Sequence, residues 1–130
     1  MFVDANIFLE IILEDQHYQQ CETFLAQCLE KKQPLYTSDF ILYSCLIILQ
    51  QKLNSLDKMR DFLTFLHSLK ITVLRPSIKA IHESTYFMQR YTLDFDDALV
   101  LGCMFENRIK ELVSYDKDFT HIKEVIIIRP

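Results

Sequence analysis

The hydrophobic positions of this chain follow two periods in alternation. Short runs are almost wholly apolar, as strands buried on both faces are, and longer stretches have apolar residues every three or four positions, as on one face of a helix. The short runs predict five strands, at residues 1–3, 35–37, 71–74, 112–115 and 125–128.

Between these strands the helical spacing predicts six helices. Residues that favour helix N-termini precede several of them, with Asn6, Ser38 or Asp39, and Asp94 as the expected N-caps. The expected helices lie around residues 6–13, 15–30, 38–51, 55–69, 76–88 and 94–105. In the fifth, the shared face is formed by Ile78, Ile81, Thr85 and Met88.

This order of elements predicts the fold class. Strands that alternate with helices form crossover units, and hence a mostly parallel sheet that is covered on both faces. A chain of 130 residues leaves room for one hydrophobic core. We therefore expect a single α/β domain over residues 1–130, built as a three-layer α/β/α sandwich around a short central sheet.

Composition and hydropathy bear on whether the protein is compact and whether it meets a membrane. Half of the residues are hydrophobic and one is glycine, which favours a compact domain with short connections. No apolar run reaches the roughly 18 residues that span a bilayer, and the N-terminal residues lack the basic region of a signal peptide. We expect a cytoplasmic protein with no membrane contact.

The four cysteines form no CxxC pair, and no histidine lies at zinc-ligand spacing from them. We expect buried, reduced thiols at Cys21, Cys28, Cys45 and Cys103. The formal charge of −4 does not indicate the basic surface of most nucleic-acid-binding proteins. Carboxylates that hold a metal ion would contribute to that charge, so the charge alone leaves the partner open.

Three acidic residues occupy corresponding places in this pattern. Asp4 follows the first strand, Asp116 follows the strand at 112–115, and Asp97 lies in the first turn of the last helix. The carboxyl ends of parallel strands meet at one edge of a sheet, where open α/β folds build their sites. Converging carboxylates repel one another unless a cation lies among them, and hard divalent ions take oxygen ligands. The sequence therefore predicts a metal-dependent site.

Several polar residues have purely structural explanations. Asp94 can cap the last helix, and Asp96 in its first turn interacts favourably with the helix dipole, by about 0.3–1 kcal/mol. Asp4 could cap the first helix, and Asp116 could start a turn. The histidines favour surface positions over metal ligation; they are His17, His67, His82 and His121. Packing is a better explanation than stacking on RNA bases for Tyr36, Tyr43, Tyr91 and Tyr115.

Three acidic motifs in this order resemble those of the PIN domain family. They read VDAN at 3–6, DFDDAL at 94–99 and VSYDKDF at 113–119. The resemblance extends over essentially the whole chain and is greatest to the small prokaryotic members, including VapC-like toxins of type II toxin–antitoxin pairs. It implies an α/β/α fold and Mg²⁺- or Mn²⁺-dependent cleavage of RNA. It also implies homodimers and, for toxins, a cognate antitoxin that blocks the site.

By this resemblance the expected catalytic residues and metal ligands are Asp4, Asp97 and Asp116. One or two metal ions about 4 Å apart can activate water, polarise a phosphoryl group and stabilise the leaving oxygen. Asn6 would orient the first of these acids, while Ser114 and Asp118 would support the third.

The chain departs from the family at one position. PIN nucleases usually carry a fourth acid, a glutamate, on the helix after the second strand, and Ser44 occupies that position here. A hydroxyl is a weak metal ligand without charge, so a second metal ion would lose its main anchor. Glu10, one helical turn beyond Asn6, is a candidate substitute, and Asp39 is another.

Two functions therefore follow from the sequence. The first is a metal-dependent endoribonuclease, as a VapC-like toxin or an RNA-processing enzyme, and the three retained acids favour it. The alternative is a catalytically weak or inactive PIN-like module that binds RNA or a protein without turnover, which Ser44 favours. A nuclease directed at DNA is a further option.

Overall fold

Five short strands form one parallel sheet in the order β3-β2-β1-β4-β5. The computed structural model describes all residues, 1–130. The strands are β1 (Phe2–Val3), β2 (Tyr36–Ser38), β3 (Thr72–Leu74), β4 (Glu111–Val113) and β5 (Ile126–Ile128). All five predicted strands are present, although β4 ends two residues earlier than expected. The predicted parallel sheet is confirmed.

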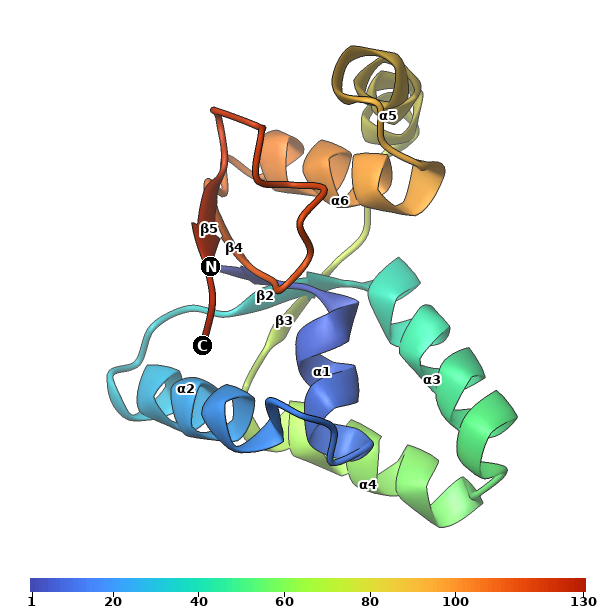
Figure 1. Cartoon of the computed structure of the whole chain (residues 1–130), viewed down its shortest axis with the longest axis vertical. Coiled ribbons are helices and arrows are strands. Elements are labelled where there is room, and N and C mark those ends of the chain that lie inside the picture. The colour runs from blue at the N-terminus through green and yellow to red at the C-terminus, as the bar shows by residue number, and fades with distance from the viewer.

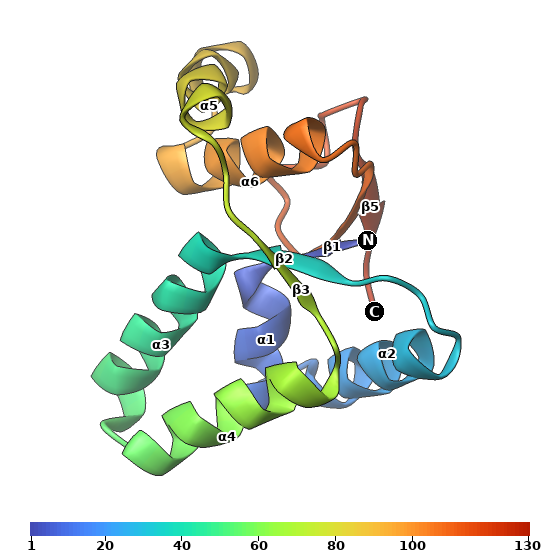
Figure 2. The same ribbon diagram turned by 180° about the vertical axis from the view of Figure 1, so that it is seen from behind.

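Six helices cover the two faces of this sheet. One face is covered by α1 (Ala5–Ile12), α2 (Tyr18–Glu30), α3 (Asp39–Leu53) and α4 (Leu56–Ser68), and the other by α5 (Ile78–Tyr91) and α6 (Phe95–Glu106) (Figures 1 and 2). The α/β/α sandwich expected from the sequence is thus confirmed. None of the six helices combines the length and apolarity needed to cross a membrane.

The direction of the strand order reverses next to β1. From β1 the chain steps to β2 and then to β3, whereas β4 pairs on the opposite side of β1 after α5 and α6 have crossed to the other face. In open α/β sheets, such a reversal leaves a crevice outside the carboxyl ends of the two central strands. The residues that follow β1 and β4 are therefore the first place to look for a site.

The N-cap of the first helix is not the residue that we expected. Asp4, not Asn6, is the N-cap of α1, and its Oδ1 accepts a hydrogen bond of 2.7 Å from the backbone N–H of Ala5. Asn6 lies within the first turn of that helix. Asp94 stands at the N-cap position of α6, but its side chain makes no capping hydrogen bond. Three other helices, α3, α4 and α5, are capped by serine hydroxyls, from Ser38, Ser55 and Ser77.

The helices α5 and α6, which cover one face of the sheet, pack against each other through small residues. A Cβ atom on Gly102 would lie 2.4 Å from Ser84 Oγ and 2.8 Å from the carbonyl oxygen of Ala80. The face of α5 that meets α6 therefore carries Ala80 and Ser84, both fully buried. The predicted apolar face of α5 was wrong in this respect, since Ile78 is 82% exposed.

A single hydrophobic core joins the sheet to both helix layers. It contains 25 buried residues, from strands and helices of both layers. The four cysteines are free and buried, as predicted. Burial raises the pKa of the Cys45 thiol to about 12, and the charge of Asp4 adds to the rise. These thiols therefore stay protonated and act as small apolar groups.

Candidate active site

Asp4 stands directly after β1, where the strand order reverses. It is 7% exposed, and Oδ2 accepts hydrogen bonds of 2.7 Å from Asn6 Nδ2 and from Ser114 Oγ. Burial raises the pKa of Asp4; the hydrogen bonds from Ser114, Ala5 and Asn6 act against the rise, and the charge of Asp116 adds to it. Because a carboxylate oxygen has about two acceptor positions, Oδ1 retains one beside its bond to Ala5.

Ser114 connects the ends of two neighbouring strands. Its hydroxyl donates to Asp4 and accepts a hydrogen bond of 3.0 Å from the backbone N–H of Asp116. Asn6 Nδ2 donates to the same hydroxyl oxygen at 2.9 Å, and Asn6 Oδ1 accepts from the backbone N–H of Tyr115 at 3.2 Å. This network is buried or partly buried, so it holds the segment after β4 against the start of α1.

Asp97 lies half-buried in the first turn of α6, and its carboxylate makes no hydrogen bond within the chain. Burial, and then the charges of Asp116, Asp94 and Asp4, raise the pKa of Asp97 to about 8. Burial is the larger cause, and the neighbouring carboxylates add to it because like charges disfavour the ionised form. The charges of Asp4 and Asp116 thus act on Asp97, and we call these three acids the acidic cluster.

Asp116 is the third acid of the cluster and follows β4. Its Oδ1 accepts a hydrogen bond of 2.8 Å from the backbone N–H of Asp118, while its Oδ2 accepts none. The side chain of Asp118 is exposed, so this residue contacts Asp116 through its backbone.

Two exposed acids add negative charge beside α6. Asp94 is at the N-cap position of the helix and Asp96 is in its first turn, and burial followed by the neighbouring Asp94 raises the pKa of Asp96. Both also act on Asp97. The sequence explained them as a cap and as partners of the helix dipole, but Asp94 makes no capping hydrogen bond.

Ser44 is the residue that we expected at the position of the family's fourth acid. It is half-buried on α3 and makes no hydrogen bond. The next residue, Cys45, lies with its Sγ 3.9 Å from the carbonyl oxygen of Ala5 and feels the charge of Asp4. This turn of α3 therefore faces the start of α1.

The two candidate substitutes for the missing acid have partners of their own. Glu10 Oε2 accepts a hydrogen bond of 2.6 Å from the backbone N–H of His17, in the connection between α1 and α2. Asp39 Oδ1 accepts one of 2.8 Å from the backbone N–H of Phe40, at the start of α3. Neither carboxylate is hydrogen-bonded to Asp4, so the network around that residue is complete without them.

The acids of the cluster suit a hard cation such as Mg²⁺ or Mn²⁺, because every donor is an oxygen. Asp97 has an unpartnered carboxylate, Asp116 has a free Oδ2, and Asp4 retains one acceptor position. As they stand, no three or more His, Cys, Asp or Glu side chains are grouped closely enough to hold a metal ion between them. An ion held here would therefore keep several water ligands, which is usual for Mg²⁺.

One contact beside the cluster was not predicted. The rings of His17 and Tyr115 are stacked, with 4.6 Å between their centroids, and the Tyr115 hydroxyl donates a hydrogen bond of 2.8 Å to the carbonyl oxygen of Pro130. The histidine was expected on the surface and is half-buried instead. Since 98 positions separate the two rings in the sequence, no local pattern could have paired them.

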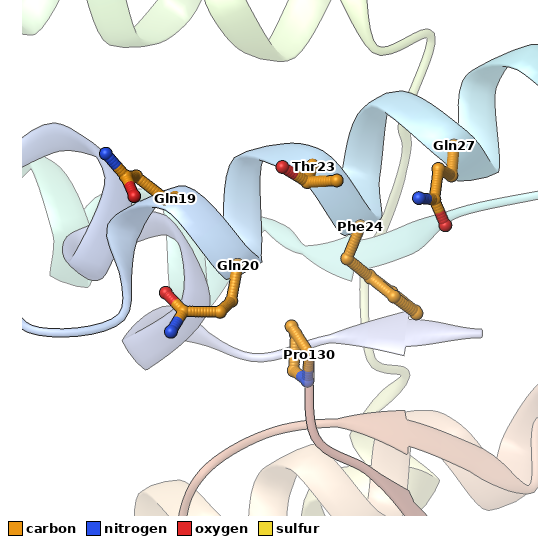
Figure 3. A pocket seen from close by; sticks show the side chains of 6 residues that line it. All are labelled: Gln19, Gln20, Thr23, Phe24, Gln27 and Pro130. Carbon is orange, nitrogen blue, oxygen red and sulfur yellow. The ribbon is translucent and has the colours of Figure 1, made fainter.

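A roomy pocket elsewhere lacks the chemistry of the acidic cluster. Figure 3 shows this pocket, of about 490 Å³, between α2 and the C-terminal residue, lined by Gln19, Gln20, Thr23, Phe24, Gln27 and Pro130. It contains amides, a hydroxyl and an aromatic ring but no titratable side chain. This pocket is therefore not a candidate for acid–base catalysis or metal binding.

Comparisons with known proteins show the family and the fold of the chain. A sequence model of the PIN domain family matches residues 1–125. No curated protein matches the chain. The fold is similar to that of VapC20 from Mycobacterium tuberculosis, a toxin that cleaves the sarcin–ricin loop, with 17% identity, a TM-score of 0.82, and coverage of 99% of this chain and 98% of that one.

Two further solved structures are similar. VapBC2 from Rickettsia felis, bound to a DNA fragment from its promoter, has 16% identity and a TM-score of 0.78, with 98% of this chain and 96% of that one covered. A toxin–antitoxin complex from Klebsiella pneumoniae has 20% identity and a TM-score of 0.73, with 96% and 94% covered. At these identities the similarity shows a common fold over nearly the full length of each chain.

Proposed function

The chain belongs to the PIN domain family, and on that premise we propose that it is a metal-dependent endoribonuclease of the VapC toxin type. One observation supports the proposal: at the reversal of the strand order Ser114 bonds to Asp4 and to the backbone of Asp116, and the charges of both acids act on Asp97. Keeping these acids ionised without a cation is unfavourable, because burial and then the neighbouring carboxylates raise the pKa of Asp97.

The proposed ligands of a divalent cation are Asp97, Asp116 through Oδ2 and Asp4 through Oδ1. A bound divalent cation polarises a phosphoryl oxygen and makes water a stronger acid at neutral pH. Asn6 and Ser114 occupy Asp4 Oδ2 and so fix which oxygen of that residue is available. The backbone N–H of Asp118 does the same for Asp116. These contacts orient the carboxylates before substrate binds.

The alternative function, binding without turnover, is favoured by Ser44. A half-buried hydroxyl brings no charge to the place where most relatives have a glutamate, so one anchor of a second ion is missing. A site with three acids can still hold one divalent ion, and one ion supplies the Lewis acid that phosphodiester hydrolysis needs. For this reason we place the nuclease first.

RNA cleavage tests the proposal. Purified protein is incubated with a labelled, mixed RNA pool in Mg²⁺, in Mn²⁺ and in chelator, beside Asp97→Asn and the control Asp57→Asn, an exposed acid on α4. We expect cleavage that needs metal, is lost in Asp97→Asn and persists in the control. Equal product from the intact protein and Asp97→Asn, or product in chelator, would reject a metal-dependent nuclease at this site.

Protein partners form the last part of the proposal. Leu56 and Leu63 lie seven positions apart on one face of α4 and are exposed, and exposed apolar faces of this kind are common at protein interfaces. We propose that this face binds a second copy of the chain, and that an antitoxin blocks the acidic cluster. Sedimentation of the intact protein and of Leu56→Lys tests the first point, with a monomeric intact protein as the contrary result.

A further inference from the structure

A groove of about 240 Å³ lies along the same edge of the sheet as the acids. Phe40, Ile81 and Leu99 give it apolar walls from three helices, α3, α5 and α6. Tyr43 and Arg75 line it as well. Neither residue belongs to the network around Asp4, so the groove is a separate part of this surface.

The sheet explains why the groove adjoins the cluster. Arg75 directly follows β3, and Asp39, which also lines the groove, directly follows β2. All strands are parallel, so these residues lie at the same edge as Asp4. Two strand spacings separate the end of β3 from the end of β1, a distance of about 10 Å. On the other wall, Leu99 is two residues beyond Asp97 on α6.

Tyr43 offers this groove an aromatic surface. Its side chain is 61% exposed, so the prediction that it packs in the core was wrong, and its hydroxyl makes no hydrogen bond. An exposed ring beside apolar walls is the arrangement on which single-stranded nucleic acids stack their bases.

Arg75 brings the positive charge that a phosphate requires. It is exposed and makes no ion pair or hydrogen bond within the chain, whose three ion pairs all involve other residues. A free guanidinium near a cluster of carboxylates gives an anionic backbone a place to bind in a protein with a net charge of −4. Asp39 would repel a phosphate but accept a hydrogen bond from a base amino group, so its end of the groove suits a base.

We propose that this groove binds one nucleotide of single-stranded RNA next to the scissile phosphate, with the base stacked on Tyr43 and a phosphate against Arg75. The proposal rests on the proposed ribonuclease function and adds to it two residues that bind the substrate. It applies to unpaired RNA, because a base inside a duplex cannot present its face to a tyrosine ring.

RNA binding without cleavage isolates the groove. Fluorescence anisotropy of a short, unstructured, labelled RNA is measured in chelator for the intact protein, Tyr43→Ala, Tyr43→Phe and Arg75→Ala. The matched controls are Tyr86→Ala, an exposed tyrosine on α5 outside the groove, and Arg60→Ala, an exposed arginine on α4. All five substitutions fall on exposed side chains, so the variants should fold.

The expected results follow from the two contacts. Tyr43→Ala should weaken binding by about 5- to 150-fold, the effect of losing one base stack, while Tyr43→Phe keeps the ring and stays within about twofold of the intact protein. Arg75→Ala should also reduce the slope of log affinity against log salt by about 0.7, the value for one phosphate contact on a single strand. The control variants should match the intact protein.

Cleavage in Mg²⁺ or Mn²⁺ then separates this proposal from the nuclease proposal. If the intact protein cleaves RNA and Tyr43→Ala changes neither affinity nor KM, the groove does not hold the substrate and the inference is overturned. If no variant cleaves RNA but Tyr43→Ala loses binding, RNA binding by the groove stands, while the nuclease proposal and the position beside a scissile phosphate fail. A loss as large in Tyr86→Ala, or no RNA binding by the intact protein, would overturn the groove proposal as well.

Discussion

Ser114 Oγ donates a hydrogen bond of 2.7 Å to Asp4 Oδ2, although 110 positions separate the two residues in the sequence. The bond is buried and joins the ends of β1 and β4. The same hydroxyl accepts from the backbone N–H of Asp116, so one side chain fixes two acids of the proposed metal site.

Ser114→Ala tests this connection. The substitution leaves Asp4 Oδ2 with one donor and the Asp116 N–H without its acceptor, and buried polar groups that lose a partner cost about 1–3 kcal/mol of unfolding free energy. We expect a loss in that range in urea unfolding with chelator. The control is Ser84→Ala, an equally buried serine whose hydroxyl bonds only to its own helix. An equal loss in the two variants would contradict the special role of Ser114.

The stability of the metal-free protein should depend on pH through Asp97. Its pKa is about 8 in the folded chain and about 3.9 in an unfolded one, so the folded state holds the extra proton between these values. The stability gained from this proton is complete below pH 4 and is lost as the pH rises to about 8. In chelator, the intact protein should therefore lose more stability than Asp97→Asn between pH 6 and pH 8.5. Parallel curves for the two proteins would show that Asp97 is not held in a repulsive cluster.

Ser44→Glu introduces the fourth acid that the resemblance to PIN nucleases leads us to expect at this position. Without metal, another carboxylate near Asp4 should lower the unfolding free energy, since like charges in a partly buried place repel. With Mn²⁺, affinity should rise about tenfold or more, because about 2 kcal/mol of attraction joins a divalent ion to a carboxylate 4 Å away even in water. The neutral Ser44→Gln is the matched control. If Glu and Gln have the same effect on Mn²⁺ affinity, Ser44 does not face the site.

Gly102→Ala should destabilise the layer formed by α5 and α6. Alanine improves helix propensity by about 1 kcal/mol, but its Cβ would meet Ser84 Oγ and the Ala80 carbonyl, and overpacking costs about 1–3 kcal/mol. We expect a net loss in thermal unfolding. Adding Ser84→Ala should restore only part of it, because the carbonyl clash remains. If Gly102→Ala is as stable as the intact protein, α5 and α6 can move apart without a loss of unfolding free energy, and the expectation is wrong.

The sequence predicted the edge of the sheet where the acids meet, because strands that alternate with helices leave little choice of topology. It could not predict the hydrogen bond from Ser114 to Asp4, which depends on the register that pairs Val3 with Val113. Asp4 and Asn6 are both good N-cap residues, so local preference could not choose between them. The choice falls on Asp4 because the Asn6 side chain bonds to Asp4 and to Tyr115.

The sequence predicted least well which side chains of the helices are exposed and which are buried. Most positions of α3 are apolar on every side, so helical spacing could not show that Tyr43 faces outward. On α5 the rule that large apolar residues are buried selected Ile78, yet the close approach of Gly102 buries Ala80 and Ser84 instead. Arg75 carried a usable signal, since it directly follows a predicted strand and must therefore lie at the edge that bears the acids.

The central claim is that three carboxylates act together as one divalent-cation site. A calorimetric titration of metal-free protein with Mn²⁺ tests it most directly, with the intact chain beside Asp97→Asn and the exposed-acid control Asp57→Asn. The account predicts saturable binding by the intact protein and by the control, and its loss in Asp97→Asn. Binding that is unchanged in Asp97→Asn, or absent from the folded intact protein, would contradict it.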